Sequence, residues 1–220
     1  MSDKTLRTPF LSILYEQYLE NQDCAVFKNK VSRCYTPGSL ERLTRHHVRE
    51  VRRAAVLALG FLGDYGSNQV VGAALLDDDR TVRLIAGNGI RSIWARAGDE
   101  ADRRQLNAVV RLNAARQYEA AIRLATELIE KSPWFAEAWH QRAAAHFSLN
   151  QFAESVRDCH EALEINPYHF VAATSMGQAY LELENYVSAL ESFRRALRLN
   201  PDLEGVRAHV IRLARMVEDR

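Results

Sequence analysis

The chain has little of the residues that break helices or cross-link chains. Among its 220 residues there are 5 prolines, 10 glycines and 3 cysteines. So few prolines and glycines leave little material for disordered linkers. The cysteines (Cys24, Cys34 and Cys159) are odd in number and form no CxxC pair, which argues against a disulfide framework and against a zinc site. We therefore expect reduced thiols and a cytoplasmic protein.

Strong net charge and long apolar runs are also missing. The formal charge is +1, so no global electric field draws the chain toward nucleic acid or an anionic membrane. The longest apolar run, Ala54–Gly63, is far shorter than the ~20 residues that a membrane-spanning helix needs. The N-terminal Met1–Arg7 carries charges without the apolar segment of a signal peptide behind them. We expect no membrane contact.

The second half of the sequence repeats with a period of 34 residues, and four columns keep one register. The columns are Pro133, Pro167 and Pro201; Tyr118, Phe152 and Tyr186; Ala121, Ser155 and Ala189; and Leu128, Ala162 and Ala196. Apolar residues inside each unit recur at helical spacing in two blocks, which predicts a pair of amphipathic helices per unit. The proline closes each unit because it cannot continue a helix.

This stretch resembles the tetratricopeptide repeat family over about residues 102–201. The best-matching units are 136–167, with Trp139 and Ala143, and 170–201, with Gly177 and Tyr180. The unit 102–133 departs from the family pattern, but we count it as a first repeat. A final amphipathic segment, 203–218, is expected to cap the exposed apolar end of the stack.

A period of 31 residues governs the first half. Val51-Arg52 matches Val82-Arg83, Ala55 matches Ala86, and Leu59 matches Ile90. The acidic run Asp77–Asp79 directly before the second helix is also typical of HEAT and armadillo repeats, which this half resembles. Upstream of these units we expect helices over 9–19, 24–34 and 39–44, with Pro37-Gly38 breaking the chain.

The sequence thus predicts an all-α fold, an α–α superhelix (solenoid) of stacked helical hairpins. Residues 1–98 form the HEAT-like region, and residues 99–220 form three tetratricopeptide repeats and the capping helix. Asp99 is the expected N-cap of the first helix after the boundary. Because no linker separates the halves, we expect one continuous right-handed stack.

No catalytic or metal-binding constellation stands out. His46 and His47 are adjacent, so they point to different faces of a helix, and no carboxylate or cysteine accompanies them. Gly87-Asn88-Gly89 lies inside a helical pattern, where it cannot cradle a phosphate. We expect no enzyme activity, no cofactor and no metal.

Basic residues crowd the segment 28–53, where eight of them face only two acidic residues. Two interpretations are open: a surface for nucleic acid or phosphates, or arginines that pair with the acidic turn of a neighbouring unit. The candidate basic surface consists of Lys28, Lys30, Arg33, Arg42, Arg45, Arg49 and Arg53.

The resemblance to tetratricopeptide repeats implies that the first helix of each pair lines a concave groove. The groove residues it selects are Leu106, Asn107, Val110, Asn113, His140, Gln141, Ala144, Phe147, Thr174, Gln178 and Leu181. Some relatives hold a C-terminal carboxylate with lysine, arginine and asparagine side chains, but the matching places here hold residues such as Gln141, Val171 and Ser175. We therefore expect a non-catalytic scaffold that binds a peptide or helix of a partner protein, without that carboxylate clamp. Nucleic-acid or phosphate binding through the basic segment is the alternative. The partner's identity and the oligomeric state do not follow from the sequence.

Overall fold

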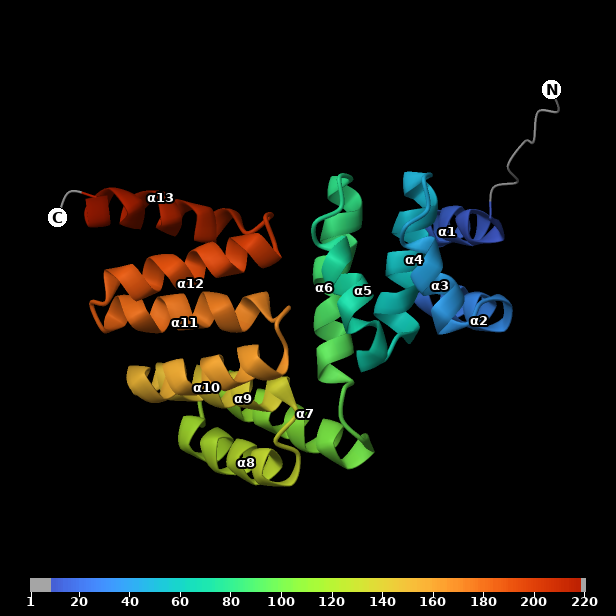
Figure 1. Cartoon of the computed structure of the whole chain (residues 1–220). Coiled ribbons are helices and arrows are strands. Elements are labelled where there is room, and N and C mark those ends of the chain that lie inside the picture. Colours follow the sequence, from blue (N-terminus) through green and yellow to red (C-terminus); the bar gives the residue numbers. More distant parts are fainter. Residues whose placement is uncertain (1–8, 219–220) are drawn as a thin grey trace. The chain divides into compact units, whose positions relative to one another are not determined.

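The computed structural model describes residues 9–218, and within that range the chain forms thirteen α-helices, one 3₁₀ turn and no β-strand (Figure 1). The predicted all-α class is confirmed. None of the helices in the described range is long and apolar enough to cross a membrane. The chain divides into two compact units, one up to Ile93 and one from Trp94 onward.

The first unit is built around one central helix, α4, against which α1, α2, α3 and α5 all pack. In chain order its elements are α1 (Phe10–Asn21), α2 (Cys24–Cys34), α3 (Pro37–Leu43), α4 (Arg49–Leu62), η1 (Tyr65–Ser67), α5 (Asn68–Ala74) and α6 (Arg80–Ala95), the last of which runs past the unit boundary. The core side of α4 is a continuous run of buried residues, among them Val51, Ala55 and Leu59, which the 31-residue period had marked.

Pro37 begins a helix and does not break one, so this part of the prediction was wrong. It occupies the first turn of α3, where a proline loses no helical hydrogen bond. Thr36 is the N-cap, and its side chain accepts a hydrogen bond from the backbone N–H of Ser39. The short helix α5 had no counterpart in the sequence analysis, because seven residues give too little periodicity to detect.

Arginines at equivalent positions of α4 and α6 fasten the turn that precedes each helix. Arg52 donates from Nη1 to the carbonyl oxygens of His46 and His47, and Arg83 donates in the same way to those of Asp77 and Asp78. The two arginines are the 31-residue pair noted in the sequence. The first unit therefore repeats one local hydrogen-bond pattern in its two hairpins, α3–α4 and α5–α6.

The second unit is a series of helical hairpins in which each helix packs against the next along the chain (Figure 1). Its elements after the end of α6 are α7 (Glu100–Ala114), α8 (Tyr118–Lys131), α9 (Ala136–Ser148), α10 (Phe152–Ile165), α11 (Phe170–Glu182), α12 (Tyr186–Leu199) and α13 (Glu204–Glu218). In addition, α7 contacts α9 and α9 contacts α11, so the first helices of successive hairpins form one layer.

The turn inside each hairpin has the same geometry at 34-residue intervals. Arg116, Asn150 and Glu184 all have left-handed backbone angles, with φ of 58°, 59° and 57°. The residue after each of them donates its N–H to the carbonyl five positions back, at 2.9 Å in all three turns. This is the Schellman ending of a helix, usually made by glycine. The hairpin 100–131 thus shares its turn with the two hairpins that follow it.

Two further expectations for the second unit are confirmed. Asp99 caps α7, since its side chain accepts a hydrogen bond of 2.8 Å from the backbone N–H of Asp102. The helix α13 covers the end of the stack, with Val206 and Leu213 buried in the same apolar cluster as Phe193 of α12. The predicted boundary at residue 98 lies five residues after the division between the compact units. Continuity of the stack across both units stays a prediction.

Candidate functional site

A chain of hydrogen bonds runs across the layer of first helices in the second unit. Asn113 of α7 donates from Nδ2 to the backbone oxygen of Gln141 at 3.0 Å and to its Oε1 at 3.1 Å. Gln141 of α9 donates in turn from Nε2 to Oε1 of Glu137 at 2.8 Å. These bonds link α7 to α9 and end on a carboxylate that faces α11.

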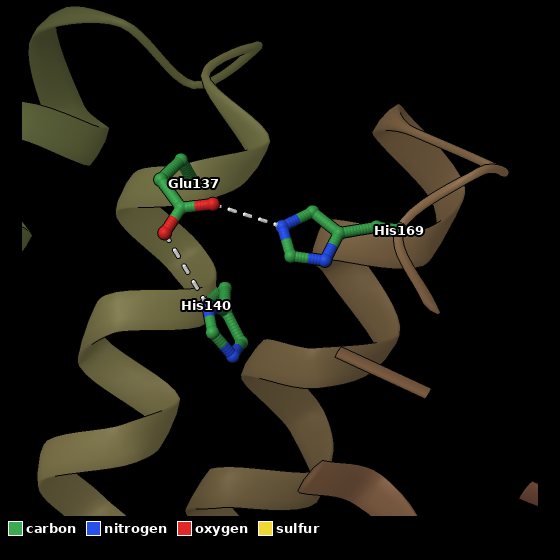
Figure 2. Close-up of side chains that lie close together, drawn as sticks. All are labelled: Glu137, His140 and His169. Carbon is green, nitrogen blue, oxygen red and sulfur yellow. Dashed lines mark hydrogen bonds and ion pairs between the residues drawn. The ribbon is translucent and has the colours of Figure 1, made fainter. Parts of the chain in front are cut away.

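Glu137 lies between two histidines (Figure 2). Its Oε2 is 3.1 Å from Nε2 of His169, and its Oε1 is 3.4 Å from Nδ1 of His140. Glu137 and His140 stand three positions apart on α9, hence on one face of that helix, whereas His169 is the N-cap residue of α11. His169 is fully buried, and the indole of Trp94, the first residue of this unit, stacks on its ring with centroids 4.3 Å apart.

The protonation states in this cluster follow from its hydrogen bonds. Nδ1 of His169 accepts a bond from the backbone N–H of Ala172 at 3.1 Å, so a neutral ring carries its proton on Nε2 and donates it to Glu137. Burial lowers the pKa of His169, and this outweighs the opposing influence of Glu137. Burial alone would raise the pKa of Glu137, but the hydrogen bonds from His140 and His169 reverse the shift and lower it.

The three side chains are of metal-ligating types, and their nearest ligand atoms lie within 4.8 Å of one another. The hydrogen bonds, however, do not suit a metal. A metal on Nε2 of His169 would need the ring proton on Nδ1, where it would meet the N–H of Ala172. A metal-bound histidine usually donates from its second nitrogen, whereas this one accepts. The donor set therefore fits a hydrogen-bonded network, with a neutral His169 beside a carboxylate, better than zinc.

A carboxylate, an imidazole and a hydroxyl also lie in a row, because Nε2 of His140 is 3.4 Å from Oγ of Ser175. The order resembles a hydrolase triad, but the surroundings do not support acyl transfer. Ser175 lies in the interior of α11, where backbone N–H groups are used by the helix and offer no oxyanion hole. The cluster thus has the chemistry of a structural network.

The residues predicted for the groove are only partly available to a partner. Leu106 is 1% exposed and packs against Leu128 and Phe135, so its assignment to the groove was wrong. His140 is also buried, at 8% exposure, and is engaged with Glu137. The other predicted residues are exposed or partly exposed: Asn107, Val110, Asn113, Gln141, Ala144, Phe147, Thr174, Gln178 and Leu181.

Ion pairs occupy part of the predicted basic surface. Arg53 binds both carboxylate oxygens of Asp79, at 2.9 and 2.6 Å, and Arg49 binds Glu50 at 2.9 Å. Arg52 binds Asp77 through two bonds of 2.8 Å and also contacts Asp78. Pairing with the acidic turn, the second of the two interpretations, accounts for Arg52 and Arg53. The remaining members of the set are exposed: Lys28, Lys30, Arg33, Arg42 and Arg45.

The family match that comparison with known proteins finds lies in the second unit. The family model for the tetratricopeptide repeat matches residues 136–169 and 171–203, which together make up less than a third of the chain. These are the hairpins α9–α10 and α11–α12 with their shared turn geometry. Residues 136–203 are tetratricopeptide repeats. No curated protein matches the sequence.

Solved tetratricopeptide repeat domains have the same fold as this unit. The first such domain of Spaghetti (RPAP3), bound to the HSP90 peptide SRMEEVD, is 21% identical over 55% of this chain and 96% of its own, with a TM-score of 0.53. The domain of Arabidopsis OM64 is 27% identical over 53% and 97%, with a TM-score of 0.51. That of Sgt2 from Aspergillus fumigatus is 19% identical over 56% and 83%, with a TM-score of 0.52.

The sequence analysis missed the role of Glu137 and His169. The repeat columns contain a signal for it, because His169 stands 34 residues after buried Phe135, in the same column. A polar residue in an apolar column needs a partner inside the protein. The partner, Glu137 on α9, lies 32 residues away in the sequence, and the column alone does not reveal it.

Proposed function

We propose that the second unit is a non-catalytic interaction module that binds a segment of a partner protein along the face shared by α7, α9 and α11. The observation that carries this proposal is the hydrogen-bonded layer Asn113–Gln141–Glu137, which joins α7 to α9. The bond of Glu137 to His169, the N-cap of α11, extends this link to the third helix and pre-forms the face. A pre-formed surface loses little entropy on binding, so a short segment can bind with useful affinity.

Apolar contacts on this face would come from three side chains. Val110 is 41% exposed, and Phe147 and Leu181 are partly exposed on α9 and α11. Asn107 and Gln178 are exposed and would form a polar rim. This combination suits an amphipathic helix or an extended peptide with apolar anchors.

The ligand we propose is an internal segment and not a free C-terminus. The solved domain of Spaghetti was bound to the HSP90 peptide SRMEEVD. In this chain, Gln141, Val171 and Ser175 occupy places where some relatives use lysine, arginine and asparagine side chains to hold a C-terminal carboxylate. Peptide SRMEEVD should therefore show no binding in calorimetry at concentrations that saturate that relative, and tight binding would contradict this part of the proposal.

For the first unit, we propose HEAT-like repeats that supply length or a second contact. Support comes from the arginine–turn pattern of Arg52 and Arg83 and from the pairing of Arg52 with Asp77. The alternative function, nucleic-acid binding through the basic segment, has less support. Carboxylates pair with Arg49, Arg52 and Arg53, so these side chains are engaged within the protein.

Site-specific photo-crosslinking tests the proposed face. A photo-reactive amino acid at Gln178 of α11 lies on the face, and one at Val187, 60% exposed on α12, serves as the control. We expect a discrete crosslinked partner from position 178 and none from 187. Equal crosslinking from both positions, or none from 178 while binding persists, would refute the proposed face.

A further inference from the structure

His169 performs two tasks that both require a neutral ring. Its Nδ1 accepts the N–H of Ala172 and caps α11, and its Nε2–H donates to Glu137 on α9. One side chain thus caps the start of α11 and binds α9. Because the ring is fully buried, water cannot replace either partner while the unit stays closed.

The groups that surround the imidazole of His169 determine the effect of adding a second proton to it. The titratable groups that act on His169 are Glu137 and His140, and both come from α9. Trp94 covers the ring face and carries no titratable group. Oε1 of Glu137 already accepts a hydrogen bond from Gln141. The ring centroid of His140 lies 4.9 Å from that of His169.

A second proton on His169 has no acceptor at Nδ1. It would point at the N–H of Ala172, so the cap of α11 would be lost and two donors would face each other. A positive charge would also enter an enclosed site beside a second imidazole. Glu137 offsets part of this cost through its carboxylate, but it cannot restore the cap.

We propose that His169 and Glu137 form a proton-controlled latch between α9 and α11, closed while His169 is neutral and released when it is protonated. Release would free the first turn of α11 and loosen its contact with α9. The latch does not depend on the partner proposed above, because it is a property of the unliganded repeats.

The direction of the pH effect follows from the lowered pKa of His169. An unfolded chain would bind the proton at the ordinary histidine value of about 6.5, whereas the folded chain binds it only at lower pH. The contribution of the latch to stability is therefore complete above about pH 6.5 and is lost as the pH falls below that value. One pH unit below it, a single such histidine changes the unfolding equilibrium constant by about tenfold.

Urea unfolding at pH 7.5 and 5.5 tests the latch in the full chain. His169→Asn retains a capping oxygen but does not titrate, and His160→Asn, on the exposed surface of α10, is the matched control. We expect the unfolding constant of the wild type and of His160→Asn to rise by about tenfold more than that of His169→Asn between the two pH values. Equal rises in all three proteins would overturn the latch.

Imidazole ¹⁵N NMR of the wild type keeps the test decisive if His169→Asn does not fold. We expect His169 to carry its proton on Nε2 at pH 7.5 and to titrate below the ordinary histidine value of about 6.5. The Ala172 amide should exchange faster as His169 becomes protonated. A proton on Nδ1, or a midpoint at 6.5 or above, would overturn the proposal. One equivalent of Zn²⁺ should leave the resonance unchanged, and a zinc-dependent shift at both His169 and His140 would replace the latch with a metal site.

Discussion

The indole of Trp94 lies flat on the imidazole of His169, with ring centroids 4.3 Å apart and planes inclined by 18°. The indole is 2% exposed, and the ring beneath it is completely buried. This stacking removes one face of the histidine from water and holds its two nitrogens toward Ala172 and Glu137.

Trp94→Ala should therefore destabilise the second unit by about 3–5 kcal/mol, because it removes a large buried side chain and opens the site around His169. Trp134, which is 50% exposed, is the control, and Trp134→Ala should cost about 1 kcal/mol or less. Urea unfolding of both variants measures the difference. Similar losses in the two proteins would argue against the packing described here.

The pair Arg52–Asp77 should contribute measurably to the first unit. Both side chains are only 12% exposed and share two parallel hydrogen bonds, so Asp77→Ala leaves a largely buried guanidinium without its main partner. We expect a loss of about 2–3 kcal/mol in the free energy of unfolding. Glu50→Ala, which removes the exposed partner of Arg49, should change it by less than about 0.5 kcal/mol. Thermal unfolding of the two variants measures the difference, and a larger loss for Glu50→Ala than for Asp77→Ala would contradict the account.

The left-handed turn residues offer a stabilising change. Arg116 has φ of 58°, a conformation that costs a side-chain-bearing residue about 1–2 kcal/mol and that glycine adopts freely. Arg116→Gly should raise the stability by about 1 kcal/mol. Ala115, its neighbour with φ of −81°, is the control, and Ala115→Gly should give no gain. Chemical denaturation that shows equal effects for the two substitutions would argue against the turn geometry.

Two glycines of the chain should respond to alanine with opposite signs. At Gly60 an added Cβ would come within 2.9 Å of the backbone Cα of Gly89, where α4 and α6 cross. Gly60→Ala should therefore push the two helices apart and cost about 1–3 kcal/mol. At Gly205 of α13 nothing lies within 4 Å, and Gly205→Ala should stabilise by about 0.5–1 kcal/mol. Calorimetry of the two variants decides the matter, and two changes of the same sign would be inconsistent with this crossing.

Much of the fold could be predicted from the sequence because the same buried positions recur in each repeat. The 34-residue columns marked buried positions such as Ala121 and Ala189, and α2 coincides with the predicted helix 24–34. Predictions failed where the role of a residue depends on contacts with neighbours that the repeat columns do not show. Leu106 faces the core because α8 packs there, and Pro37 begins a helix because Thr36 caps it.

The candidate site was harder to predict for the same reason. Glu137 lies on α9 and His169 caps α11, and each looks like an ordinary polar residue when its own helix is considered alone. Only the packing of α9 on α11 brings them within hydrogen-bond distance. The availability of the basic residues in the first half also could not be predicted from the sequence alone. Pairing with the acidic turn determines which arginines stay exposed, and only the structure shows this pairing.

The central claim is that a partner segment binds the face shared by α7, α9 and α11, and a binding comparison tests it most directly. Phe147→Glu combined with Leu181→Glu places charge at two apolar positions of that face, whereas Val187→Glu places it on the outer surface of α12. With the partner recovered by the wild-type chain, we expect the double variant to lose at least tenfold in affinity while Val187→Glu retains it. Undiminished affinity of a folded double variant would contradict the account.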